Sequence, residues 1–406
     1  TQGVSSAASD VYKRQLFVVN NFNFGGPQKS LLNLIYELKD TNTEIDIIIL
    51  NQEDTLTKYL PKYVNVKTIS SKFSILMLNK NNLIQNMLKN LISPKLVFNA
   101  FIFMIKSQLN LHNNTKAKQK FWINNKWQEI VNQETYDYAI GVSGGHSVYF
   151  IEDYVKAKKK IGWIRTDYRV LKRDLSIDRF YFKKMNGMLS VSKMCSDIFE
   201  NIFNIKPITY YNSLPIKLYE NIPDEQIKLD TNYFNLCTIC RLDYGKGLDL
   251  MIEATKILKS NNLNVKWYVV GKGKLDQWLH DEIIKNDLQD MLIPLGFKFN
   301  TGSIVKNMDV LVHPSRFEGK SNTIDEALHY NIPVVATNFS TVYEQIKDNE
   351  NGFIVNMSGN DIATKIEYLY NNRDDYHKIQ KNLKREHQEI TNKGQEFLGT
   401  ILNIGG

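Results

Sequence analysis

A chain of 406 residues is long for a single compact core, so its length favours two domains. With 43% hydrophobic and 23% charged residues, its composition is that of an ordinary soluble protein. Three cysteines are too few for a disulfide framework, which favours a reducing compartment, and no apolar run reaches the ~18 to 20 residues that a membrane span needs.

Charge is unevenly distributed within a formal net charge of +8. Up to Lys217 the chain has 30 Lys and Arg against 17 Asp and Glu, and after it 21 against 26. The stretch 55–128 has 12 Lys and no acidic residue. It predicts either an anionic partner (lipid phosphate, a polyphosphate polymer or nucleic acid) or a solvated lysine-rich surface. Its apolar run 96–105, between Lys95 and Lys106, suits an interfacial helix and equally a buried one.

The first half of the chain reads as a series of strands and helices. Residues 1–15 lack an initiator Met and an apolar core, and we treat them as a non-native leader rather than a signal peptide. A strand over 16–19, a loop with two glycines, an amphipathic helix and a strand over 45–50 predict the opening of a doubly wound parallel sheet. Amphipathic helices are predicted over 70–130, and further strands over 138–142, 160–164, 187–191 and 208–215.

A second series of strands and helices follows the polar linker 221–232. Its strands are predicted over 234–240, 265–270, 291–295, 310–313 and 333–336, with helices between most of them. We therefore predict an α/β protein with an N-terminal domain over 16–217 and a C-terminal domain over 218–385. A C-terminal helix over 386–406 completes the chain, and its packing back on the N-terminal domain is left open.

The segment 313–345 is the most informative for chemistry. In it a predicted strand is followed by a loop with Gly319 and by a helix that begins near Asn322. The start of a helix presents unpaired N–H groups and a positive dipole end, which bind phosphate. Glu318 and Glu326 flank this start, and a carboxylate placed like Glu326 can accept hydrogen bonds from a ribose diol. The alternative is that both are ordinary surface carboxylates.

Two cations, Arg241 and Lys246, follow the first strand of the C-terminal domain. Ligands bind at the carboxyl edge of parallel sheets, where Arg and Lys can contact phosphate oxygens. Taken alone, the pair would equally suit a charged surface. The sequence Gly-Lys-Ser at 319–321 suggests a P-loop, but Pro314 stands where a Walker A motif needs its first glycine. A nucleotide triphosphatase of that type is therefore excluded.

Together these residues resemble the GT-B glycosyltransferases of family 4, the retaining group with an E-x7-E signature. The resemblance spans nearly the whole chain after residue 15 and is strongest over 236–356. It rests on R-L-x-x-x-K-G at 241–247, V-V-G-x-G at 269–273, the block 293–337 with both glutamates, and Gly25-Gly26 in the first βα loop. It implies a GT-B fold, in which two Rossmann-like domains face each other across a cleft, and relatives that build bacterial cell-surface polysaccharides.

The resemblance also implies roles for single residues. Glu318, Arg241 and Lys246 are implied to be catalytic, the two cations by neutralising the diphosphate leaving group and Glu318 by contacting the sugar. The residues implied to bind the donor are Gly25, Gly26, Gly271, Gly273, Lys320, Ser321, Asn322, Thr323 and Glu326. No metal is expected, because the sequence contains no D-x-D pair.

One segment departs from the family pattern. Where some relatives carry W-I-H-x-D, this chain has Arg165 at the histidine position and keeps Asp167. Arg165 then either binds phosphate or pairs with Asp167. His146, in the glycine-containing loop 143–147, is a substitute candidate for the active site or an ordinary loop histidine.

The function implied is a metal-independent, retaining transfer of a hexosyl or N-acetylhexosaminyl group from a nucleotide diphosphate sugar, with UDP favoured. The implied acceptor is a glycan, a lipid-linked glycan or a phosphate-containing polymer, and no cofactor or nucleic acid is expected. The location expected is the cytoplasm, with the basic stretch 55–128 as a candidate contact with the inner face of the plasma membrane. The alternatives are a GT-B nucleotide-sugar 2-epimerase and a non-catalytic module that binds anionic lipid or nucleic acid.

Overall fold

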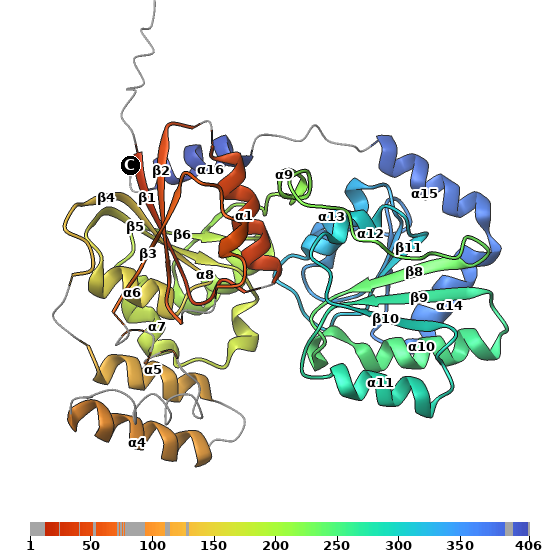
Figure 1. Cartoon of the computed structure of the whole chain (residues 1–406), viewed down its shortest axis with the longest axis horizontal. Coiled ribbons are helices and arrows are strands. Elements are labelled where there is room, and N and C mark those ends of the chain that lie inside the picture. The colour runs from red at the N-terminus through yellow and green to blue at the C-terminus, as the bar shows by residue number, and fades with distance from the viewer. Residues whose placement is uncertain are drawn as a thin grey trace, which may run out of the picture.

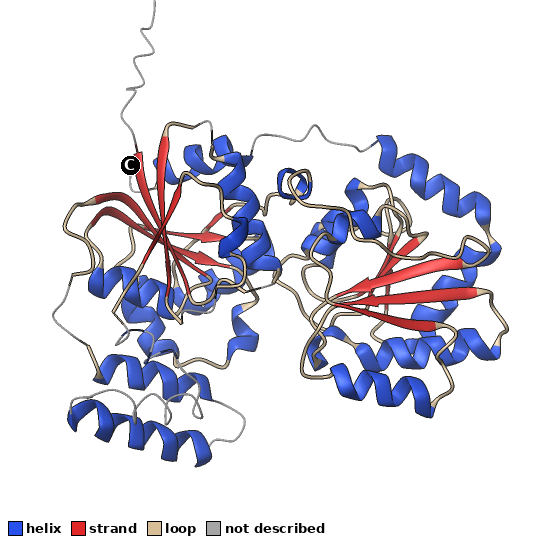
Figure 2. Cartoon of the chain, viewed as in Figure 1, coloured by secondary structure: helices blue, strands red, loops and turns tan. Residues whose placement is uncertain are grey.

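A computed structural model of the chain describes residues 13–23, 25–39, 41–51, 54–70, 73, 75, 77, 94–109, 114–126, 130–385 and 393–404. Two α/β domains lie side by side, each built around one sheet (Figure 1). Helices flank the strands of each sheet (Figure 2). This is the doubly wound, two-domain architecture that the alternation of strand and helix patterns predicts.

The N-terminal domain holds a seven-stranded sheet in the order β3-β2-β1-β4-β5-β6-β7. Its strands are β1 (Lys13–Val19), β2 (Thr43–Ile49), β3 (Val64–Lys67), β4 (Tyr136–Val142), β5 (Ala157–Ile164), β6 (Gly187–Ser190) and β7 (Ile208–Thr209). The helices and 3-10 turns are α1 (Gly26–Glu37), η1 (Thr57–Tyr59), α4 (Pro94–Leu109), α5 (Asn114–Asn124), α6 (His146–Tyr154), η2 (Tyr168–Leu171), α7 (Leu175–Phe182), α8 (Lys193–Phe203) and α9 (Ile216–Tyr219). All neighbouring strands pair in parallel, and the strand order reverses between β1 and β4. Ligands bind at such reversals in open parallel sheets.

Strand β1 begins earlier than the sequence predicts. It starts at Lys13 rather than Leu16, and its register with β2 runs from the Lys13–Thr43 pair without a break. The polar residue Gln15 is fully buried in this strand. The apolar pattern begins only at Leu16, so it hid the polar start of the strand. Residues 1–12 lie outside the described residues.

The C-terminal domain holds a six-stranded sheet in the order β10-β9-β8-β11-β12-β13. Its strands are β8 (Phe234–Ile239), β9 (Val265–Val270), β10 (Leu292–Gly296), β11 (Val310–His313), β12 (Val334–Thr337) and β13 (Phe353–Val355). The helices and 3-10 turns are η3 (Tyr244–Lys246), α10 (Leu248–Ser260), α11 (Asp276–Lys285), α12 (Thr301–Val305), α13 (Asn322–His329), η4 (Val342–Glu344), α14 (Gly359–Asn371) and α15 (Arg373–Arg385). The order reverses between β8 and β11, so each sheet has a reversal at which a ligand can bind.

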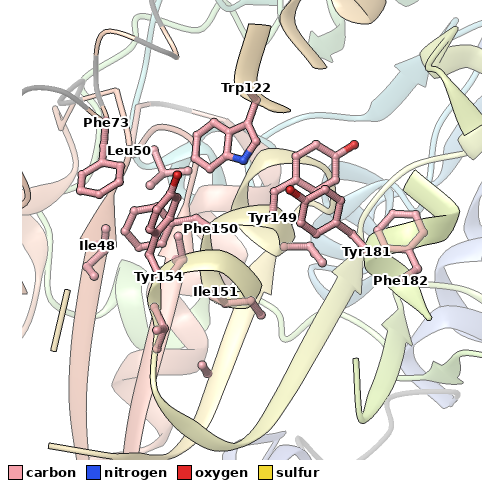
Figure 3. Packing of buried hydrophobic residues seen from close by; sticks show 14 of the residues in the cluster. Ile48, Leu50, Phe73, Trp122, Tyr149, Phe150, Ile151, Tyr154, Tyr181 and Phe182 are labelled. Atoms are coloured by element: carbon pink, nitrogen blue, oxygen red, sulfur yellow. The ribbon is translucent and has the colours of Figure 1, made fainter. Parts of the chain in front are cut away.

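Large aromatic side chains fill the core on one face of the N-terminal sheet (Figure 3). Trp122 of α5 packs against Tyr149 and Tyr154 of α6, and the rings of Tyr149 and Tyr181 stack with their centroids 4.0 Å apart. Side chains of this size bury much apolar area each. This face therefore fixes α5, α6 and α7 firmly against the sheet.

The other face of the N-terminal sheet is completed by the end of the chain. Helix α16 (Lys393–Leu402) lies on the N-terminal domain, far from α15 of the C-terminal domain (Figure 1). Its residues Phe397 and Ile401 are fully buried in the same cluster as Phe17 and Trp163. The rings of Trp163 and Phe397 are 5.6 Å apart. The core of the N-terminal domain therefore includes a segment that follows the whole C-terminal domain in the sequence.

Candidate active site

The two domains enclose a cavity of about 1000 Å³ at the carboxyl ends of their strands. Twelve residues that the sequence assigned to a site line it: Gly25, Gly26, Arg165, Arg241, Lys246, Gly271, Glu318, Lys320, Ser321, Asn322, Thr323 and Glu326. Three others, Gly273, His146 and Asp167, do not line it. The fold therefore brings together most of the predicted site from segments that are far apart in the sequence.

The start of α13 faces this cavity, as the sequence predicts. Ser321 caps the helix, its hydroxyl accepting from the amide of Ile324 at 3.4 Å. The amide of Ser321 is already engaged, because it donates to Oε1 of Gln345 at 2.9 Å. The amide that was predicted to bind the donor thus has a partner within the C-terminal domain, and its contact with a donor stays a prediction. The amides of Asn322 and Thr323, on the first helical turn, have no intrahelical acceptor and remain for an anion.

Glu326 lies one turn into α13 and is only 2% exposed. Its Oε2 accepts a hydrogen bond from the hydroxyl of Thr301 at 2.8 Å. Thr301 begins α12, and its hydroxyl is 2.6 Å from that of Tyr219. The Tyr219 side chain also hydrogen-bonds to the Glu326 carboxylate. A carboxylate held in this way at the cavity wall can accept hydrogen bonds from a pair of neighbouring hydroxyls.

A buried lysine from the opposite domain, not among the predicted site residues, joins this network. Lys29 of α1 donates to the hydroxyls of Tyr219 and Thr301, at 3.1 and 3.0 Å, and to the carbonyl of Phe299 at 3.0 Å. Burial lowers the pKa of Lys29, and the nearby Glu326 carboxylate partly offsets this effect. The only available signal was the position of Lys29 just after Gly25-Gly26. Through Lys29, the N-terminal domain thus contacts Thr301, the residue that donates a hydrogen bond to Glu326.

Glu318 and Lys246 form a largely buried ion pair in the cavity wall, 2.5 Å apart. His313 and Ser315 also contact Oε1 of Glu318, each at 3.1 Å. Burial alone would raise the pKa of Glu318, but the charge of Lys246 and the contact with His313 outweigh it and hold this pKa well below its usual value. Burial would lower the pKa of Lys246, and the Glu318 carboxylate outweighs this in turn, so the pKa is raised. Both groups are therefore charged at neutral pH.

His313 is a member of this cluster that the sequence analysis passed over. It ends β11 and is buried, with Nε2 on Glu318 and no hydrogen-bond partner for Nδ1 among the described residues. The available signal was its position as the last residue of a predicted strand, which is where site residues lie in parallel sheets.

Arg241 lies at the cavity mouth, where 75% of its side chain is exposed. Its Nε donates to Asp243 at 2.6 Å. An exposed ion pair of this kind contributes little to stability and can exchange partners. Arg241 is thus placed to reach an anion only by leaving Asp243.

The two glycines of the V-V-G-x-G segment have a packing role. Gly271 has a φ of 150°, and a Cβ there would lie 1.8 Å from the carbonyl oxygen of Cys240. At Gly273 a Cβ would lie 2.2 Å from the carbonyl oxygen of Leu242. Only glycine lets these two loops approach each other so closely. Gly271 also lines the cavity, whereas Gly273 packs against the loop at Leu242 and does not line it.

The three candidate residues Arg165, Asp167 and His146 of the N-terminal domain do not contact one another but have different partners. Asp167 pairs with Arg169, whose Nη2 lies 2.6 Å away, and not with Arg165 as one alternative predicted. Arg165 instead donates to Oδ1 of Asn212 at 2.7 Å. His146 is buried among the rings of Trp122 and Tyr149, away from the cavity. The use of His146 as a substitute active-site histidine is therefore not supported by its position.

Among the described residues, no three or more His, Cys, Asp or Glu side chains are grouped so that they could hold a metal ion. Metal independence nevertheless stays a prediction.

Comparison with known proteins agrees with this architecture. Residues 221–386 match the family model of the glycosyl transferases group 1. The chain is 26% identical over 235 residues to an uncharacterized glycosyltransferase of Methanocaldococcus jannaschii, a match covering 56% of this chain and 62% of that protein. It is 29% identical over 138 residues to the poly(ribitol-phosphate) alpha-N-acetylglucosaminyltransferase of Staphylococcus aureus, covering 33% of this chain and 28% of that protein. In both matches the chain spans less than two thirds of the relative.

Solved structures give the fold of the whole chain. A mutant of TarM from Staphylococcus aureus, bound to UDP, matches with a TM-score of 0.64 and 16% identity over 97% of this chain and 100% of that one. Anabaena HepE with UDP-glucose matches with a TM-score of 0.67 and 15% identity over 96% of this chain and 100% of that one. The chain therefore has the GT-B fold. Within this fold, residues 221–386 are similar to the glycosyl transferases group 1.

Proposed function

We propose that this chain is a family 4, retaining glycosyltransferase that moves a hexosyl or N-acetylhexosaminyl group from a UDP-sugar without a metal ion. The observation that carries the proposal is Glu326, a buried carboxylate in the cavity wall, beside the amides of Asn322 and Thr323 on one helix. A carboxylate suits the diol of a ribose, and the helix start suits a diphosphate. Relatives named as UDP-dependent and polysaccharide-building enzymes support the same donor class.

In the reaction that we propose, negative charge grows on the diphosphate as its bond to the sugar breaks. Groups that are fixed in advance stabilise this charge most as it forms. The dipole of α13 and its first amides are fixed in this way, and Lys246 is held by Glu318. In a retaining front-face reaction the leaving phosphate oxygen would accept the proton of the acceptor hydroxyl. Arg241 would add its charge after leaving Asp243.

A thermal-shift panel of nucleotides and nucleotide sugars with EDTA present tests the donor site. We expect UDP and a UDP-sugar to raise the melting temperature of the wild type and not that of E326A. The exposed Glu350 offers the matched control E350A, which should respond like the wild type. If no nucleotide stabilises the wild type, the proposed activity is wrong. If E326A responds fully, the assignment of Glu326 is wrong.

For the acceptor we propose a glycan, lipid-linked or phosphate-containing polymer at the inner face of the plasma membrane. Helix α4 supports the membrane part, because it forms an outer layer of the N-terminal domain away from the other domain (Figure 1). Leu96, Ala100 and Phe103 are buried, whereas Phe98 and Phe101 are 64% and 56% exposed. Helix α4 therefore packs on the domain through one apolar face and leaves large apolar side chains exposed, which can insert into a membrane interface. None of the helices in the described part of the chain has the length and apolar character of a membrane span.

Liposome flotation tests this part separately. Vesicles containing anionic lipid should carry the wild type at low salt, and replacing Phe98 and Phe101 by Ser should weaken the binding. The stretch 55–128 also includes residues outside those described, so α4 is the segment to alter. Absence of wild-type binding at low salt would overturn the membrane assignment without touching the donor site.

A further inference from the structure

Arg165 differs from three other cations of the cavity wall, because it has no carboxylate partner among the described residues. Lys246, Lys320 and Arg241 each contact a carboxylate, from Glu318, Asp325 and Asp243 respectively. Arg165 is only 7% exposed, yet no carboxylate of the described residues lies within ion-pair distance of it. Its Nε and Nη1 have no hydrogen-bond partner in the described part of the chain. Arg165 is therefore a buried positive charge with unused donors.

The contacts that Arg165 does make are weak substitutes for an anion. Nη2 donates to Asn212 at 2.7 Å, and the guanidinium lies over the ring of Trp163 with Cζ 4.4 Å from its centroid. Neither group carries a negative charge. Burial lowers the pKa of Arg165 to about 9, which shows that the surroundings disfavour the charge. A buried charge without a counter-charge is destabilising, and such groups concentrate at functional sites.

Arg165 lies on the cavity wall of the N-terminal domain, across from the start of α13. It directly follows β5, and Asn212 follows β7, so both extend from the carboxyl edge of the N-terminal sheet. Asn212 donates to the side chain of Asn322 at 2.7 Å, and Asn322 in turn donates to the carbonyl of Gly26 at 2.9 Å. The guanidinium is thus two hydrogen bonds away from α13, on the wall that the N-terminal domain contributes.

We propose that Arg165 binds a second anionic group of a substrate, a phosphate or carboxylate that is separate from the donor diphosphate. This rests on the proposed function for the position of the diphosphate at α13. The planar fork of Arg matches the two oxygens of either group, and its unused N–H groups are the donors that such a group needs. The anion belongs either to the acceptor, as a phosphate in its backbone, or to the transferred sugar, as an acidic sugar.

Binding measurements with R165M, R165K and the control K156M test this. Lys156 is an exposed cation of the same domain, so K156M changes the net charge equally. The probes are UDP, UDP-glucose against UDP-glucuronic acid for the sugar source, and glycerol 3-phosphate against glycerol for the acceptor source. We expect R165M to lose at least about tenfold in affinity for one of the anionic probes and to change UDP affinity by less than about threefold. R165K keeps the positive charge but not the planar guanidinium, so its affinity for that probe should lie between those of the wild type and R165M.

Thermal unfolding without ligand separates binding from a structural role. Because R165M removes an uncompensated buried charge, we expect it to melt no lower than the wild type. A large fall in its melting temperature, unchanged binding of both anionic probes, or an equal loss of UDP would each overturn the inference. Glycerol 3-phosphate is tested without nucleotide. A wild type that binds it through Arg165 but binds no UDP would therefore refute the proposed donor site and leave this inference standing.

Discussion

The two walls of the cavity compensate their positive charges differently. On the C-terminal wall, Lys246 and Arg241 each contact a carboxylate of their own domain. On the N-terminal wall, Lys29 contacts neutral oxygens and the rings of Tyr219 and Phe299, and Arg165 contacts an amide and a ring. The C-terminal wall is thus electrostatically complete when its own domain folds. The N-terminal wall is completed by something else: the other domain for Lys29 and, as we propose, a substrate for Arg165.

Breaking the pair of the C-terminal wall should have the largest effect. K246M would leave the Glu318 carboxylate buried without its counter-charge, and we expect a loss of about 3 to 5 kcal/mol in the free energy of unfolding. Urea denaturation measures this. The double variant K246M/E318Q should recover much of the stability while glycosyl transfer stays lost. A loss below about 1 kcal/mol in K246M would mean that the pair is not closed in solution.

The same pair predicts a pH dependence. Because the pKa of Glu318 is lower when folded than unfolded, its ionised form stabilises the fold above its ordinary pKa. That contribution is lost as the pH falls below the ordinary value toward the folded one. E318Q should therefore lose less stability than the wild type between pH of about 5 and 3. Parallel curves for the two proteins would contradict this.

Lys29 tests whether the N-terminal wall depends on the other domain. In K29M the carbonyl of Phe299 and the hydroxyl of Thr301 lose a charged donor, and we expect a loss of about 1 to 3 kcal/mol in stability. UDP affinity, measured by calorimetry, should fall by about tenfold, because Thr301 positions Glu326. The matched control is K39M, which removes an exposed lysine just after the same helix. Equal UDP affinity in K29M and K39M would show that the domain contact does not support the nucleotide site.

His146, which lies away from both cavity walls, should change the free energy of unfolding by a similar or smaller amount than Lys29. Burial, followed by the charge of Arg173, lowers its pKa from 6.5 to about 3, so it is neutral when folded. The unfolded chain binds a proton below its pKa of 6.5 and the folded chain does not, so stability falls with decreasing pH across this window, by up to ~1.4 kcal/mol per unit. H146N should remove this slope in denaturation curves at several pH values. A slope that persists unchanged would place the proton on another group.

Arg241 should give the smallest change in stability. Its pair with Asp243 is largely exposed, so R241A should alter the free energy of unfolding by less than about 1 kcal/mol. Transfer should nevertheless slow, because the proposed role of Arg241 arises only as the leaving group becomes charged. Steady-state kinetics with D243A as the companion variant separates the two effects. An unchanged rate in R241A would remove Arg241 from the proposed mechanism.

Much of the fold could be predicted from local patterns. The alternation of short apolar strands with amphipathic helices predicted both parallel sheets. Strand ends followed by Gly, Arg or Glu predicted which edge of the sheets borders the cavity. The start of α13 and Glu326 were predicted because a helix N-terminus has a definite sequence pattern. These features depend on residues close together in the sequence.

The rest of the site depends on contacts between distant segments. Gln345 occupies the amide of Ser321, and Lys29 reaches Thr301 from the other domain, but neither pairing leaves a local pattern. The separation of Arg165 from Asp167 was equally hidden, because two residues so near in sequence turn to opposite partners only through the packing around β5. His146 follows a glycine-containing strand end, the usual place for a site residue, yet the aromatic core takes it inward.

The return of α16 to the N-terminal domain constrains how the chain acquires its structure. During synthesis the N-terminal sheet emerges first, but the places of Phe397 and Ile401 beside Phe17 and Trp163 stay empty until the entire C-terminal domain has been made. An apolar face of the first domain is then open to solvent while the C-terminal domain is translated. Since domains otherwise tend to fold in the order of synthesis, the second domain can reach its final form before the first. A separately expressed N-terminal domain would need α16 supplied, either fused or as a peptide, to close its core.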